Sequence, residues 1–131
     1  MKELRKKRIL LGKMGLDAHD NGIHVVAKWL ADAGFEVIYA GLYNTPQRLC
    51  QTALQEGVDA IGCSFLGGEH LFYADRLLAQ LRERGLQELK LVFGGVIPPD
   101  DVKTLKEMGV SLVFTPGTLR QEIVEAVKNL W

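Results

Sequence analysis

The stretch that decides the fold is the apolar run Ile9-Leu10-Leu11, followed by Lys13-Met14-Gly15-Leu16-Asp17-Ala18-His19-Asp20-Asn21-Gly22. It places the set Asp-x-His-x-x-Gly, with a lysine just upstream, in the loop between a first strand and a first helix. In an open α/β sheet such a loop lies at the carboxyl end of a strand, where ligands bind. A histidine whose second ring nitrogen is oriented by a nearby carboxylate is the arrangement that a metal ligand requires. We therefore expect a ligand site in this loop.

Each residue of this loop also has a simpler interpretation. His19 alone is compatible with a surface histidine, and Lys13 with a surface charge. Their spacing around Asp17 favours a functional set, because a carboxylate that accepts the other ring N–H fixes the tautomer of His19, and a paired lysine tunes the carboxylate's charge. Gly15 and Gly22 suit tight turns and close approach of the backbone to a bulky ligand, although glycines are common in loops.

Length and composition favour an ordinary globular domain. The 131 residues are enough for one domain but not two, so we expect residues 1–131 to form a single domain, with 1–7 as a short basic lead-in. Sixteen basic and sixteen acidic residues cancel, so the composition indicates neither nucleic acid nor an anionic membrane as a partner. No apolar run resembles a signal peptide or a bilayer span, so we expect a cytoplasmic protein.

Strand and helix patterns alternate along the whole chain. We expect strands at 8–12, 35–39, 59–64, 89–93 and 111–114, and helices at about 23–33, 46–56, 69–84, 99–108 and 119–130. Five β/α units predict an α/β fold with a doubly wound, five-stranded parallel sheet in the order 2-1-3-4-5, the flavodoxin-like (Rossmann-like) arrangement, with helices on both faces. The loops at 13–22 and 64–70 then flank the ligand crevice.

Three further loops at the same edge contain small or polar residues. Ser64 can donate to a buried ring nitrogen or simply cap a turn. Gly94 and Gly95 fit no phosphate-binding pattern, but they allow the backbone to lie flat against a ligand. Thr118 either faces the same crevice or caps the last helix. Each of these loops therefore has a structural as well as a ligand-binding interpretation.

The remaining candidate residues give weaker evidence of a functional role. Cys50 and Cys63 form no C-x-x-C pattern, so we expect them to be buried free thiols. His24 and His70 have no supporting pattern, and His24 is expected on a helix surface.

Together these loops resemble the cobalamin-binding domain of methylmalonyl-CoA mutase and related acyl-CoA mutases. The resemblance covers the chain from about Arg8 to the C-terminus. The D-x-H-x-x-G set alone is shared with glutamate mutase small subunits and B12-dependent methyltransferases. The residues 94–99, after strand four, narrow the resemblance to the acyl-CoA mutase branch. The segments that carry it are Lys13…Asp17-x-His19-x-x-Gly22, Ser64-x-Leu66, Gly94-Gly95-Val96-Ile97-Pro98-Pro99 and Pro116-Gly117-Thr118.

The resemblance implies base-off, histidine-on binding of adenosylcobalamin. His19 would be the lower axial ligand of cobalt, and Asp17 and Lys13 would join it as a catalytic set that tunes the metal. Ser64 would hydrogen-bond the displaced dimethylbenzimidazole, and other residues would line the nucleotide tail. The cofactor-binding set is then Gly15, Asp17, His19, Gly22, Ser64, Leu66, Gly94, Gly95 and Thr118.

The same resemblance implies the B12-binding subunit of an isomerase that rearranges the carbon skeleton of an acyl-CoA by radical chemistry. Methylmalonyl-CoA, converted to succinyl-CoA, is the default substrate, and isobutyryl- or 2-hydroxyisobutyryl-CoA is the alternative. Such enzymes bind the acyl-CoA in a (β/α)8 barrel of about 250 residues. We therefore expect a large barrel-bearing subunit as partner and no activity without it. Phe65, Leu66, Leu71 and Phe72 would be contacts to that partner or to the corrin, unless they are tucked into the core.

Two other functions compete with this interpretation. A corrinoid carrier of a methyltransferase system usually has a helical domain before the B12 module, for which the residues before strand one leave no room. A flavodoxin-like or receiver-type signalling domain without a corrinoid would need a hydroxyl-rich loop after strand one, or an aspartate where Ser64 stands. The sequence favours neither.

Overall fold

The computed structural model describes residues 6–131, in which five strands and five helices alternate along the chain. Lys2 and Arg5 of the basic lead-in lie outside the described residues. The strands form one parallel sheet in the order β2-β1-β3-β4-β5. The predicted doubly wound α/β fold is therefore confirmed. The strands are β1 (Arg8–Met14), β2 (Glu36–Asn44), β3 (Ala60–Phe65), β4 (Lys90–Gly95) and β5 (Leu112–Phe114).

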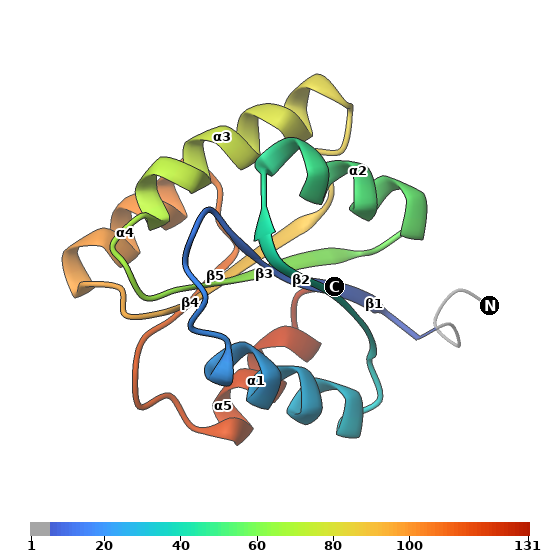
Figure 1. Cartoon of the computed structure of the whole chain (residues 1–131). Coiled ribbons are helices and arrows are strands. Elements are labelled where there is room, and N and C mark those ends of the chain that lie inside the picture. The colour runs from blue at the N-terminus through green and yellow to red at the C-terminus, as the bar shows by residue number, and fades with distance from the viewer. Residues whose placement is uncertain (1–5) are drawn as a thin grey trace.

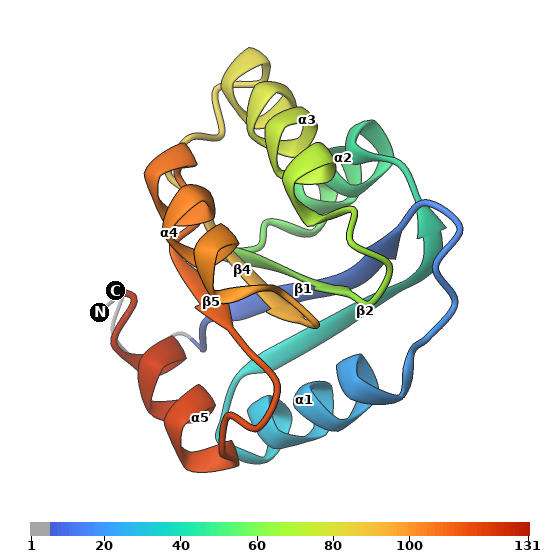
Figure 2. The same cartoon turned by 90° about the vertical axis from the view of Figure 1, so that its left-hand side faces the viewer.

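The helices cover both faces of the sheet, as Figures 1 and 2 show. Two of them pack on one face and three on the other, which creates two separate apolar cores. No helix between residues 6 and 131 is long and apolar enough to cross a membrane. One face holds α1 (Asn21–Asp32) and α5 (Arg120–Lys128), and the other holds α2 (Pro46–Glu56), α3 (His70–Glu83) and α4 (Pro99–Met108).

Strand β1 lies inside the sheet, between β2 and β3, and this position explains why its run Ile9-Leu10-Leu11 is apolar without interruption. Side chains alternate between the two faces of a strand. Leu10 accordingly packs into the core under α2, α3 and α4, whereas Ile9 and Leu11 pack into the core under α1 and α5. Because both faces are covered by helices, every position of this run is buried.

The helix boundaries follow local capping chemistry, with one correction at α5. Thr45 accepts the Arg48 N–H, and Pro46 occupies the first turn of α2. Thr118 does not cap α5, because the cap position is Leu119, whose N–H donates to the Glu122 carboxylate. Asp20 stands at the cap position of α1 without making a side-chain capping bond.

Four strands, β1 to β4, extend beyond the predicted C-terminal bounds, which moves site residues out of loops. β1 continues to Met14 because β2 continues to Asn44 and pairs with it, past two register irregularities. The Asn44 amide donates to the carbonyls of Lys13 and Gly41, at 3.1 and 3.0 Å, and so satisfies polar groups where the ladder is irregular. Lys13 therefore belongs to the strand, and β4 likewise includes Gly94 and Gly95.

Helix α2 offers a matched test of the larger core. Leu49 is fully buried in that core, whereas 55% of Leu54 on the same helix is exposed. We expect Leu49→Ala to lower the free energy of unfolding by about 2–5 kcal/mol, because it leaves a cavity in a packed interior. Leu54→Ala should change it by less than about 0.5 kcal/mol. Urea denaturation followed by circular dichroism measures both, and equal losses would contradict the assignment of the core.

Candidate functional site

The loop after β1 is organised around a buried lysine. Lys13 is fully buried, so its interpretation as a surface charge is wrong. Its Nζ lies 2.9 Å from Asp17 Oδ2 and donates to the Ser64 carbonyl at 2.8 Å. A buried ammonium is tolerated only when it is paired and hydrogen-bonded, and these two acceptors meet that need. The lysine thus ties the end of β1 to the end of β3.

Asp17 is the most heavily hydrogen-bonded group of the site. Its Oδ1 accepts the His19 N–H at 3.0 Å and faces His19 Nδ1 at 2.8 Å, while Oδ2 also accepts the Leu66 N–H at 3.1 Å. Burial alone would raise the pKa of Asp17. The bonds from the His19 N–H, the Lys13 ammonium, the His19 ring and the Leu66 N–H outweigh it and hold this pKa well below the usual range. The carboxylate is therefore ionised at neutral pH.

His19 is oriented by this carboxylate and remains accessible. Its side chain is 72% exposed, although Nδ1 is held by Asp17. A carboxylate beside Nδ1 favours the tautomer with the proton on that nitrogen. The lone pair is then on Nε2, which is the form of imidazole that binds a transition metal.

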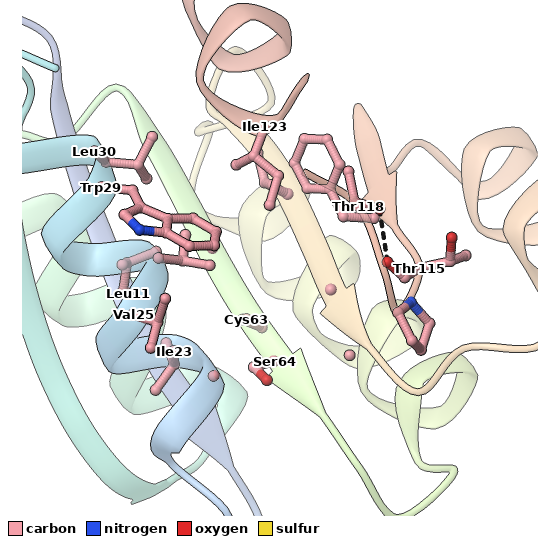
Figure 3. A pocket seen from close by; sticks show the side chains of 18 of the residues that line it. Leu11, Ile23, Val25, Trp29, Leu30, Cys63, Ser64, Thr115, Thr118 and Ile123 are labelled. Carbon is pink, nitrogen blue, oxygen red and sulfur yellow. Dashed lines mark hydrogen bonds between the residues drawn. The ribbon is translucent and has the colours of Figure 1, made fainter. Parts of the chain in front are cut away.

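Beside this loop, a pocket of about 520 Å³ lies between the sheet and helices α1 and α5. Figure 3 shows Ile23, Val25 and Trp29 of α1 on one side of it and Thr118 and Ile123 on the other. Its lining is mostly apolar, with the Ser64 side chain on the sheet as one of few polar groups. Such a space suits a bulky, largely apolar group with a few hydrogen-bonding atoms.

Glycines shape the sheet side of this pocket. Gly95 has a φ of +114°, and a Cβ there would collide with the backbone carbonyl of Phe65 on the neighbouring strand. By contrast, a Cβ at Gly94 would make only ordinary contacts, the nearest at 3.7 Å, and one at Gly22 would meet no atom within 4 Å. Both residues line the pocket, so side chains at these two positions would occupy pocket space without clashing with the protein.

Comparisons with known proteins identify the family. The family model of the B12 binding domain matches residues 7–125. The chain belongs to the B12-binding domain family. It is 42% identical over 123 residues to the 2-hydroxyisobutanoyl-CoA mutase small subunit of Aquincola tertiaricarbonis, covering 94% of this chain and 90% of that protein. It is also 42% identical over 117 residues to human mitochondrial methylmalonyl-CoA mutase, covering 89% of this chain but 16% of that protein.

A solved structure supports the fold of this B12-binding domain. The monomethylamine corrinoid protein of Methanosarcina barkeri superposes with a TM-score of 0.82 at 20% identity, over 95% of this chain and 58% of that one. At that identity the likeness concerns the fold alone.

The structure brings the predicted site residues of the B12-binding domain together in two adjoining groups. Lys13, Asp17 and His19 form the hydrogen-bonded set at the loop, with Gly15 close by, where a Cβ would collide with the Tyr73 hydroxyl. Leu66 belongs to both groups, because its N–H donates to Asp17 and its side chain lines the pocket. The predicted residues in the pocket lining are Gly22, Ser64, Leu66, Gly94, Gly95 and Thr118.

Several features of the site were not predicted. Val25 and Trp29 of α1 line the pocket, and neither was among the predicted site residues. Their spacing of four residues was the available signal, since it places them on one helix face. The Thr118 hydroxyl donates to the Thr115 carbonyl at 2.6 Å, a turn contact that neither interpretation of Thr118 anticipated. Phe65, expected as a possible partner contact, is buried in the core, whereas Leu66 and Phe72 are exposed.

The two cysteines are free and buried, as predicted. Burial raises the pKa of Cys50 to about 11 and that of Cys63 to about 12. Both thiols therefore stay protonated at neutral pH and are poor nucleophiles or metal ligands, although Cys63 borders the pocket.

The low pKa of Asp17 predicts a pH dependence of stability. A carboxyl whose folded pKa lies below its ordinary value of 3.8 stabilises the fold fully above that value and loses this contribution as the pH falls through the folded pKa. We expect the free energy of unfolding to fall more steeply below about pH 4 in the wild type than in Asp17→Asn. At neutral pH that variant should be the less stable protein, because Lys13 loses its buried counter-charge.

Urea denaturation at a series of pH values measures this difference. Asp20→Asn is the matched control, because among residues 6–131 the Asp20 carboxylate pairs with the half-exposed His24 on α1. Parallel curves for wild type and Asp17→Asn would contradict the prediction.

Proposed function

We propose that this chain is the cobalamin-binding small subunit of an adenosylcobalamin-dependent acyl-CoA mutase. The observation that carries the proposal is the orientation of His19. Its Nδ1 is held 2.8 Å from the Asp17 carboxylate while the ring remains exposed beside an apolar pocket. A carboxylate that holds one ring nitrogen in this way prepares a histidine to ligate a metal through its other nitrogen. His19 would hold the cobalt of the cofactor through Nε2.

The pocket and its glycines fit the nucleotide tail of the cofactor. Ser64 would hydrogen-bond the displaced dimethylbenzimidazole, since its side chain is a polar group on the sheet side of an apolar space. Leu66 and Thr118 would line the tail. Gly94 would keep the sheet side of the pocket open and Gly22 the α1 side. Gly95 would let β4 pass close to the Phe65 backbone, and Gly15 would allow the loop to pass close to Tyr73.

The role of this chain is to orient the cofactor and tune its electronics. When bound, adenosylcobalamin supplies the carbon radical that starts the rearrangement. Asp17 would hold the Nδ1 proton of His19 and increase the basicity of Nε2. Lys13 would limit that effect, because its buried ammonium 2.9 Å from Asp17 withdraws negative charge from the ring. The three residues thus set how strongly the imidazole donates to cobalt.

A larger subunit would complete the enzyme. Support comes from the 2-hydroxyisobutanoyl-CoA mutase small subunit, which is similar over nearly its whole length, and from methylmalonyl-CoA mutase, which contains a similar segment within a much longer chain. Exposed apolar side chains at the carboxyl edge of the sheet suit a covering partner, which would carry the (β/α)8 barrel that binds the acyl-CoA. They are Leu16, Leu66, Phe72 and Val96.

The axial ligand can be tested by absorbance spectroscopy. We expect the purified chain to bind hydroxocobalamin with a spectrum that shows a protein imidazole on cobalt, and His19→Ala to lack that spectrum. Asp17→Asn should weaken binding by about 10- to 100-fold, the usual cost of losing the carboxylate that orients a ligating histidine. His24→Ala is the matched control, because it removes a histidine from another exposed histidine–aspartate pair. Identical spectra for wild type and His19→Ala would refute the ligand assignment.

The partner and substrate need a separate assay. We expect thioester rearrangement only when the chain is combined with its copurified large subunit and adenosylcobalamin. Methylmalonyl-CoA, isobutyryl-CoA and 2-hydroxyisobutyryl-CoA should be compared, since the acyl-CoA would bind in the large subunit. Turnover by the small chain alone would contradict the proposal that the acyl-CoA binds in the large subunit. Cobalamin binding without a rearranged thioester in any combination would favour a corrinoid carrier instead.

A further inference from the structure

A second histidine–aspartate pair lies outside the proposed ligand set. His70, the first residue of α3, is only 3% exposed, and its Nε2 lies 2.7 Å from Oδ2 of Asp101 in the first turn of α4. Nδ1 of this ring is also buried and has no hydrogen-bond partner among residues 6–131. The Asp101 carboxylate fixes the tautomer with the proton on Nε2, which leaves Nδ1 as an unpaired acceptor.

This pair differs from the other histidine–aspartate pair that stands apart from the ligand set. His24 and Asp20 are four residues apart at the start of one helix and half-exposed, so their contact is local. His70 and Asp101 are 31 residues apart and join the turn that precedes α3 to the start of α4. A buried charge-assisted hydrogen bond between two elements restricts their relative position far more than an exposed local one.

The turn that His70 terminates also supplies a hydrogen bond to the proposed site. It begins at Leu66, whose N–H donates to Asp17 Oδ2 at 3.1 Å. Gly67 and Gly68 follow, and Gly68 has a φ of +83°, so the middle of the turn has little intrinsic stiffness. The His70 ring packs edge-on against Phe65, the residue just before the turn, with ring centroids 6.3 Å apart. His70 thus contacts the start of the turn and forms its end.

We propose that the His70–Asp101 bond is a clamp that keeps the Leu66 N–H on Asp17. Because His70 at the end of the turn is bound to α4, Leu66 at the beginning of the turn has one favoured position. In that position its N–H lies against the Asp17 carboxylate. The loop after β4 strengthens this arrangement, because the Val96 N–H donates to the Phe65 carbonyl at 2.9 Å. His70 and Asp101 are therefore positioning residues that act on His19 through Leu66 and Asp17.

The proposal has two parts that can fail independently. The effect of the clamp on the Leu66 amide concerns the protein without any ligand. Its effect on cobalamin rests on the function proposed above. Both parts predict that loss of the clamp alters the site without unfolding the sheet. The Asp17 carboxylate would still be held by its bonds from Lys13 and His19.

Amide hydrogen exchange measured by NMR on the ligand-free chain tests the first part. We expect His70→Ala and Asp101→Ala each to speed exchange of the Leu66 amide by about tenfold or more, because the bond to Asp17 opens more often. Exchange at Ile61, a buried residue near the start of β3, should stay as in the wild type. The matched control is Asp100→Ala, which removes the same charge from the same helix turn at an exposed position. His70→Gln, which can still donate to Asp101, should restore much of the protection.

Each outcome decides the proposal. Unchanged exchange at Leu66 in a folded His70→Ala or Asp101→Ala protein would overturn the clamp, and so would an equal increase in Asp100→Ala. If His70→Ala does not fold, Asp101→Ala decides, because Asp101 is partly exposed on a helix where alanine is well tolerated. The second part is tested with hydroxocobalamin at saturation, where both clamp variants should show a smaller histidine-coordinated fraction than wild type. A wild type without histidine coordination would refute the proposed function and leave the exchange result standing.

Discussion

The site depends on one carboxylate held in place by four donors. Asp17 receives hydrogen bonds from the Lys13 ammonium, the backbone and ring of His19, and the Leu66 N–H. These donors come from the end of β1, from the loop itself and from the turn after β3. Because Lys13 is buried, it needs this counter-charge, so folding of the sheet and orientation of His19 are coupled. A change at any of the three positions is therefore transmitted to the imidazole.

The sheet topology explains why the loop that holds His19 and the pocket adjoin. β1 and β3 are neighbours in the centre of the sheet, and the chain leaves them toward opposite faces, to α1 and to α3. The crevice between the two loops opens at the switch point, where doubly wound folds bind ligands. Leu66 connects the two groups, since its amide reaches Asp17 and its side chain borders the pocket. One cofactor can thus contact both.

The proposed function divides the work between two chains. In this proposal the domain supplies an oriented histidine, the Asp17–Lys13 pair beside it and an adjoining pocket, all at one edge of the sheet. Exposed apolar side chains such as Leu16 and Phe72 surround the same edge, which is where a cofactor and a second subunit would cover them. The proposed clamp of His70 and Asp101 joins α3 to α4 and would hold the turn that begins at Leu66. Rigid support of this kind keeps a ligand in the productive orientation.

Five alternating strand and helix patterns were enough to predict the sheet order, because right-handed crossovers and short connections favour one doubly wound arrangement. The spacing of Asp17 and His19 likewise predicted their contact, since both lie in one short loop. Tertiary structure decided the rest. Lys13 was expected in the loop beside Asp17, but only the tertiary structure shows that it lies in β1 and is fully buried. Likewise, no local pattern could reveal that His70 meets a residue 31 positions away. Contacts between distant segments depend on tertiary packing, which a local sequence pattern does not specify.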